Sequence, residues 1–213
     1  MSDTEESQLR TSYAQRLRIL AQVCSEIEAL LASMLRGFPR VDKIAGRPKP
    51  PDRFTEKAFR LDDKTGKRKY ADPLKDIQDQ VALRVVVYYR SDVQPVREAV
   101  LREFREIEDT AKEHPDPGMF GYEAHHFICM IPPEIIAKYQ PPIDFFELQI
   151  STLFQHAWAE ANHDLGYKPT TPLDFDQRRQ IAWAAAQAWG ADEIFLAQWK
   201  TCQSRSALTD NAN

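Results

Sequence analysis

The segment 77-IQDQVALRVVVYY-89 contains a run of β-branched and aromatic residues that predicts a β-strand over 83-LRVVVYY-89. This run does not alternate between apolar and polar residues, which is typical of a strand buried on both faces. Two further strands are predicted, at 125-HHFICMI-131 and 144-DFFELQI-150. The core of the protein is therefore expected to be a β-sheet.

Helical patterns surround these strands. Apolar residues recur at helical spacing from about residue 7 to residue 35, where Gly37 and Pro39 end the pattern. Asp92 is expected to cap a helix after the first strand, and two more helices are predicted over 152–165 and 174–202.

This order of elements predicts an α+β fold (mixed α/β), with a small mixed sheet of about five strands flanked by helices. We divide the single domain into an N-terminal helix (1–36), a core (37–170) and a C-terminal helix with its tail (171–213).

Composition narrows the class of protein. The 213 residues are 43% hydrophobic and 28% charged, as in an ordinary globular protein, and no apolar run is long enough to span a bilayer. The N-terminus is polar and acidic, unlike a signal peptide, and three widely spaced cysteines predict neither a disulfide framework nor a zinc site. A cytoplasmic protein without a membrane segment is expected.

Positive charge is concentrated in one region although the net charge is −4. Residues 36–69 contain twelve Lys or Arg against five Asp or Glu. In this region Arg47 and Lys49 precede Arg53, Lys57 and Arg60, which would share one face of a helix. Cations that converge in this way favour a polyanion such as a triphosphate, and the alternative is a solvated basic face.

Two carboxylates stand at positions where packing would not place them. Asp79 lies at the mouth of an apolar strand, and Glu147 and Gln149 share one face of a strand otherwise made of Phe and Ile. Together Asp79 and Glu147 would form a Mg²⁺ site, and Glu147 could also take a proton from an attacking hydroxyl. The alternatives are a turn or cap role for Asp79 and a salt bridge to a buried arginine for Glu147.

Other common chemistries lack their signatures. His156 and His163 are seven residues apart with Glu160 between them, which is not the H-E-x-x-H spacing, so core or supporting histidines are expected. The sequence contains neither a P-loop nor a G-x-S-x-G elbow, and Cys129 is interpreted as a core residue.

Five motifs occur in order: R-x-K at 47, I-x-D-x-x-A-x-R at 77–84, Gly121-Tyr122 with His126, E-x-Q-I-x-T at 147–152, and W-A-E-x-x-H-x-x-x-Y-K at 158–168. Together, over roughly residues 40–170, they resemble the RelA/SpoT synthetase domain. In length the chain is similar to small alarmone synthetases and their toxin relatives. The resemblance implies a nucleotidyltransferase-like synthetase fold.

The resemblance also assigns roles to residues. It implies that Arg47 and Arg84 lie near the adenine of ATP, and that the phosphates are bound by Lys49, Arg53 and Lys57.

On the same grounds Asp79 and Glu147 are the Mg²⁺ ligands and catalytic residues, and Tyr122 stacks on the acceptor base. Three further residues fall on the acceptor side: His126, Gln149 and His163.

The implied activity is transfer of pyrophosphate from ATP to a ribose 3′-hydroxyl, with GDP or GTP as acceptor and (p)ppGpp as product. Departures from the family pattern cluster on the acceptor side: the loop reads 121-GYEAHH-126 where G-Y-R-S-L-H is usual, Ser151 replaces an arginine, and Asn162 replaces a glutamate. The tRNA 3′-CCA end and adenine nucleotides therefore stay open as acceptors, as does an inactive nucleotide-binding homologue. An antitoxin and a second copy of the chain are the protein partners that the resemblance suggests.

Overall fold

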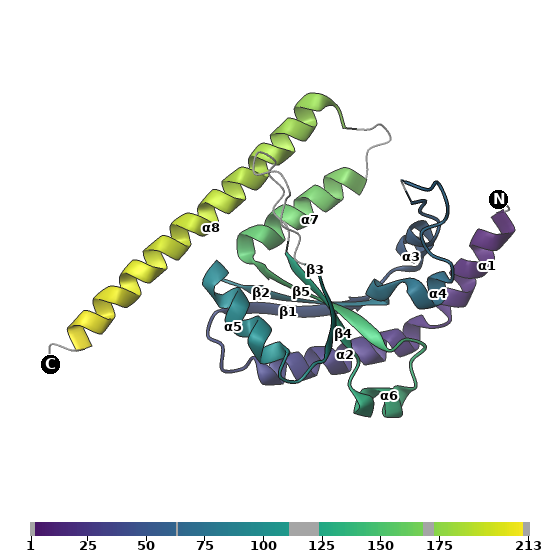
Figure 1. Ribbon diagram of the computed structural model, residues 1–213, viewed down its shortest axis with the longest axis horizontal. Coiled ribbons are helices and arrows are strands. Elements are labelled where there is room, and N and C mark those ends of the chain that lie inside the picture. The colour runs from purple at the N-terminus through teal and green to yellow at the C-terminus, as the bar shows by residue number, and fades with distance from the viewer. Residues whose placement is uncertain (1–2, 63, 111–123, 168–172, 211–213) are drawn as a thin grey trace.

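The computed structural model describes residues 3–62, 64–110, 124–167 and 173–210. The elements follow one another as α1 (Asp3–Ala14), α2 (Leu17–Met34), β1 (Val41–Pro48), α3 (Pro51–Ala58), α4 (Pro73–Asp76), a 3₁₀ turn (Gln78–Gln80), β2 (Val81–Val87), α5 (Arg90–Val100), β3 (Glu106–Thr110), β4 (His125–Met130), α6 (Pro133–Tyr139), β5 (Phe145–Thr152), α7 (Leu153–Tyr167) and α8 (Phe175–Asp210) (Figure 1).

The strands form one mixed sheet in the order β1-β2-β5-β4-β3. β2 and β5 run parallel, and the other neighbouring strands are antiparallel. In Figure 1, α2 and α6 lie on one side of the sheet, and α7 and α8 lie on the other. The predicted α+β class with a five-stranded mixed sheet is confirmed.

The two edge strands were not predicted as individual elements. β1 (Val41–Pro48) contains Asp42, Lys43 and Arg47, and β3 has the sequence EIEDT. Charged residues and a terminal proline are common on edge strands because they discourage pairing with other chains. The same residues remove the β-branched pattern by which the central strands were predicted.

The helical boundaries differ from the prediction in three places, one of which is the end of α8 at Asp210 instead of residue 202. The N-terminal helix is divided at Gln15 and Arg16 into α1 and α2, and the Arg16 guanidinium donates to the Leu74 carbonyl at 2.9 Å. Tyr89, not Asp92, occupies the N-cap of α5. Asp92 lies three residues further on, where its carboxylate accepts the backbone N–H of Tyr89 at 3.2 Å.

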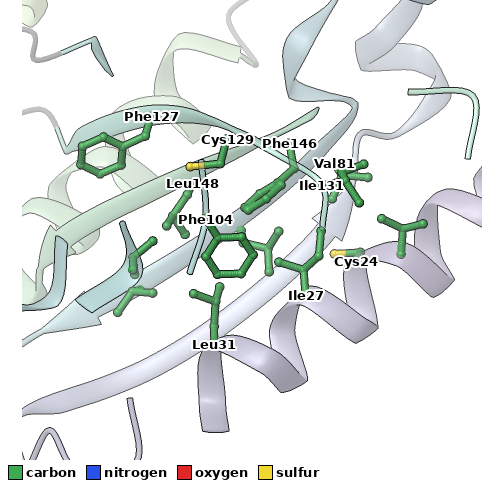
Figure 2. Packing of buried hydrophobic residues seen from close by; sticks show 14 of the residues in the cluster. Cys24, Ile27, Leu31, Val81, Phe104, Phe127, Cys129, Ile131, Phe146 and Leu148 are labelled. Carbon is green, nitrogen blue, oxygen red and sulfur yellow. The ribbon is translucent and has the colours of Figure 1, made fainter. Parts of the chain in front are cut away.

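The hydrophobic core lies between the sheet and α2. Figure 2 shows Cys24, Ile27 and Leu31 of α2 beneath Phe146 and other sheet residues, all of them nearly or fully buried. Burial raises the pKa of the Cys24 and Cys129 thiols to about 12, so neither is a thiolate nucleophile. Among the helices in the described ranges, none has the length and apolar character needed to cross a membrane.

At Gly46 of β1 the strand packs tightly against α2. A Cβ atom there would lie 2.6 Å from the Cys24 sulfur and 3.0 Å from Cγ of Leu83. The Gly46 N–H also donates to the Glu28 carboxylate at 2.9 Å. This close packing sets the position of Arg47, the next residue along β1.

We expect Gly46→Ala to lower the free energy of unfolding by about 1–3 kcal/mol, because overpacking forces backbone or side-chain shifts. Urea denaturation measures the change. Gly37→Ala is the control, since no atom lies within 4 Å of a Cβ built there. Equal stabilities for the two variants would contradict the close packing of α2 on β1.

Candidate active site

The strand register brings the predicted polar residues onto one face of the sheet. Arg47 and Glu147 both pair with Ala82 of β2, from opposite sides. Arg84 and His126 both pair with Gln149 of β5. Directly paired residues point to the same side of a sheet, so these side chains gather on the face that α7 covers.

Asp79 lies just before β2 and contacts two cations. Its Oδ2 is 2.8 Å from the Lys49 ammonium and 2.9 Å from the Lys57 ammonium. Burial raises the pKa of Asp79, but the two ammonium groups lower it further, and the result lies below the ordinary value of 3.8. Its Oδ1 is buried and has no hydrogen-bond partner among the described residues.

The two lysines are held in place by α1 and α3. The Tyr13 hydroxyl of α1 donates to the Lys49 carbonyl at 2.9 Å, and the Lys49 N–H donates to the Gln80 carbonyl at 2.8 Å. The Tyr13 ring stacks on Phe54 of α3 with their centroids 3.8 Å apart. Because Lys57 is on α3, this stacking fixes both cations relative to Asp79.

The predicted face of three cations on one helix is only partly formed. α3 ends at Ala58, so Arg60 lies beyond it. Arg53 and Arg60 both pair with Glu56, at 3.4 and 3.5 Å. Lys49 and Lys57 of this segment contact Asp79.

Arg84 is held at its edges by three side chains. Its Nε and one terminal nitrogen donate to Gln149 Oε1, both at 3.2 Å. The other terminal nitrogen donates to His156 Nδ1 at 2.8 Å and to Glu160 Oε1 at 2.5 Å. Four of the five guanidinium N–H donors are thus engaged.

The Arg84 contact determines the state of His156. A guanidinium has no acceptor, so Nδ1 of His156 must accept and any ring proton resides on Nε2. Burial and the adjacent Arg84 charge lower the pKa of His156 below 6.5. The ring is therefore neutral at neutral pH.

Glu147 is tied to His126 and Gln149. His126 Nδ1 lies 2.9 Å from Oε1, and the Gln149 amide donates to Oε2 at 3.0 Å. Burial raises the pKa of Glu147, but the contacts with His126 and Gln149 outweigh burial and hold it below 4.5. The charge of Asp79 raises the pKa of Glu147, so the two carboxylates are close enough to interact.

The residues fit a Mg²⁺ ion that is shared with a substrate. No group of three or more His, Cys, Asp or Glu suited to a metal is present in the described parts of the chain. Mg²⁺ is commonly bound through one or two carboxylates together with substrate phosphates. The buried, unpaired Oδ1 of Asp79 suits such a ligand, with Glu147 as the second carboxylate.

Two residues predicted for the acceptor side are still to be placed, His163 and Tyr122. His163 is exposed on α7, further along the helix than Glu160. Tyr122 lies outside the described residues, as does Glu123. Conversely, sequence reasoning did not assign His156 and Glu160 to the site, although their spacing of four residues places them on one face of α7.

The family described as "Region found in RelA / SpoT proteins" matches residues 46–171, more than half of the chain. The chain belongs to the RelA/SpoT family. The matched region contains the strand and helix residues of the cluster, from Arg47 to Glu160.

Several relatives of this RelA/SpoT chain are known. GTP pyrophosphokinase YjbM of Bacillus subtilis is 28% identical over 160 residues, which cover 72% of this chain and 69% of that protein. The crystal structure of small alarmone synthetase 1 from Bacillus subtilis superimposes with a TM-score of 0.72 at 20% identity, covering 91% of this chain and 99% of that one. A GTP pyrophosphokinase family protein from Streptococcus pneumoniae gives 0.69 at 23% identity, with 98% of both chains covered.

Proposed function

We propose that this chain transfers the β,γ-pyrophosphate of ATP to the ribose 3′-hydroxyl of a guanine nucleotide, GDP or GTP. The observation that carries the proposal is the Asp79 carboxylate, which contacts Lys49 and Lys57 and keeps one buried oxygen without a partner. A carboxylate between two ammonium groups is suited to a triphosphate and its metal ion.

In the proposed reaction the acceptor 3′-oxygen attacks the β-phosphorus of ATP. The bond from that phosphorus to the α,β-bridging oxygen breaks, so AMP leaves and the acceptor gains a 3′-pyrophosphate and loses a proton. Lys49 and Lys57 would hold the phosphates in line for this attack, and positioning supplies much of the catalysis in such transfers. A Mg²⁺ ion held by Asp79 and Glu147 would neutralise charge on the phosphate oxygens.

The adenine base is assigned to the flat faces of Arg84 and Arg47. Because the edges of the Arg84 guanidinium are occupied by Gln149, His156 and Glu160, its planar face is the part left to offer a ligand. Arginine stacks well on aromatic rings. Arg47 projects from the same face of the sheet, and the pKa of Glu160 is lowered mainly by its hydrogen bond to Arg84, with a smaller contribution from the charge of Arg47.

Glu147 is better suited to bind metal than to act as the general base. A general base works best with a pKa near the working pH, whereas the pKa of Glu147 is held below 4.5. Both of its oxygens already receive hydrogen bonds, which keeps the carboxylate ionised and fixed in orientation. Gln149 accepts a hydrogen bond from Arg84 and donates one to Glu147. Gln149 therefore lies between the proposed adenine site and the proposed metal site, and we do not assign it to the acceptor alone.

The guanine nucleotide is favoured as acceptor by the relatives. The related Bacillus subtilis protein is named a GTP pyrophosphokinase, and small alarmone synthetase 1 has crystal structures with its product pppGpp and with AMPCPP. A second candidate keeps the chemistry but uses the 3′-end of tRNA or an adenine nucleotide. It is favoured by Ser151, which is buried where the family carries an arginine and so offers no cation to a 5′-phosphate.

The acceptor is tested by incubating the protein with γ-³²P-ATP and, separately, GDP, GTP, AMP, ADP, ATP or total tRNA. Label on GDP or GTP supports the proposal. Label on tRNA or an adenine nucleotide alone supports the second candidate. Binding of ATP with no labelled acceptor would support an inactive homologue.

We expect Arg47→Ala and Lys57→Ala each to weaken ATP binding about tenfold. Lys57→Ala removes a charged hydrogen bond to phosphate, which contributes about 1.5–3 kcal/mol. Arg47→Ala removes a cation stacked on the adenine, which contributes up to about 2 kcal/mol when desolvated. Isothermal calorimetry with AMPCPP measures the affinity. Arg60→Ala is the matched control, since Arg60 is exposed and pairs with Glu56. Unchanged affinity in both site variants would place the ATP site elsewhere.

A further inference from the structure

Glu160 occupies an unexpected position for an acidic residue. It projects from α7 onto the face where the ATP-binding cations gather, and its side chain is 55% exposed. A carboxylate there repels a triphosphate. Exposed ion pairs contribute little to stability. Stabilisation of the fold by the pair with Arg84 therefore does not explain why a glutamate occupies this position.

The geometry around Arg84 indicates what Glu160 does. Gln149 holds the guanidinium from the β5 side, and His156 and Glu160 hold it from α7. Gln149 and the neutral His156 carry no charge, so Glu160 supplies the charge-assisted contact in this set. Without that contact, the strongest acceptors within reach of Arg84 would be phosphate oxygens of the bound nucleotide.

We propose that Glu160, together with His156, is a positioning residue that keeps the Arg84 guanidinium engaged at its edges, so that its flat face stays available to the donor base. This inference rests on the proposed function, because it concerns the base-binding part of the same ATP site. Glu160 thereby favours a complete nucleotide over a bare polyphosphate.

The test compares two ligands that differ in the presence of a nucleoside. Calorimetry measures the binding of AMPCPP and of inorganic tripolyphosphate to the wild-type chain and to Glu160→Ala. We expect AMPCPP affinity to fall about tenfold in the variant, while tripolyphosphate binds equally well or more tightly. In steady-state assays KM for ATP should rise by a similar factor, with kcat and KM for the acceptor within about twofold of wild type.

Two further variants separate positioning from general effects. Glu160→Gln keeps an acceptor for Arg84 but loses the charge, so its AMPCPP affinity should lie between those of the wild type and Glu160→Ala. Glu26→Ala removes another exposed glutamate that is paired, through Lys138 and Tyr139, next to α6 and away from this face. It should leave the binding of both ligands unchanged, and thermal unfolding verifies that each variant is folded.

The failures of the two proposals are distinguishable. A wild-type chain that binds neither AMPCPP nor tripolyphosphate would overturn the proposed function itself. A wild-type chain that binds AMPCPP, with a folded Glu160→Ala variant of unchanged affinity, would overturn the positioning role alone. A parallel loss of affinity for AMPCPP and tripolyphosphate would also overturn it, because the effect would then not depend on the base.

Discussion

Asp79→Asn is expected to reduce pyrophosphate transfer by at least about 1000-fold while the chain remains folded. The substitution removes the charge that Lys49 and Lys57 contact and the proposed ligand of the phosphate-bound metal. Such a site contributes several kcal/mol to the transition state, and each 1.36 kcal/mol is a factor of ten in rate. Turnover is measured with saturating ATP and acceptor over a range of Mg²⁺ concentrations.

The same substitution should cost about 1–3 kcal/mol of stability, because two partly buried ammonium groups lose their partner. The pKa of Asp79 is lowered in the folded chain, so its contribution is present at neutral pH and is lost as pH falls through the folded-state pKa. Asp76→Asn, at an exposed position three residues earlier, is the control. Near-normal turnover by a folded Asp79→Asn protein would remove Asp79 from the catalytic site.

Glu147→Gln should lower kcat by at least about 100-fold, an effect of the size expected for a charged group that acts directly on the reaction. The change removes the negative charge that holds His126 and serves as the second proposed metal ligand. Turnover of the purified variant measures the loss. Glu134→Gln, on α6 across the sheet, is the control and should retain wild-type activity.

The pH dependence of the wild-type enzyme separates the two roles of Glu147. Its pKa lies below 4.5, so the carboxylate is ionised throughout pH 6–8, and its titration should leave no inflection in kcat over that range. An acid-side inflection between pH 6 and 8 that disappears in Glu147→Gln would contradict the assignment and indicate a general base with a raised pKa.

The central strands of the sheet were predictable because long runs of apolar residues are typical of strands buried on both faces. β2 and β5 lie at the centre of the sheet, and their buried runs of valine, phenylalanine and leucine identify them. The edge strands β1 and β3 were not found individually because their solvated edges permit charges. Nor does apolar spacing reveal the break at Gln15 and Arg16, since helical periodicity continues across it.

The candidate site was predictable at positions where a charged side chain stands among apolar residues, because burying an unpaired charge costs free energy. Glu147 on a buried strand and Asp79 at a strand mouth are unusual for this reason. The structure places Glu147 opposite Ala82 of β2, and Asp79 just before β2 in contact with Lys49 and Lys57. The holding of Arg84 by His156 and Glu160 depends on how α7 packs on the sheet. These contacts join residues more than seventy positions apart in the sequence, so local sequence patterns do not predict them.

In the proposed reaction two phosphates move together from ATP to the acceptor. This transfer is tested by running the reaction with β-³²P-ATP and, in parallel, γ-³²P-ATP, with GDP as acceptor. Both labels should enter the acceptor in equal amounts, and one AMP should be released for each product molecule. Transfer of the γ label alone, with ADP as the other product, would contradict the proposed reaction.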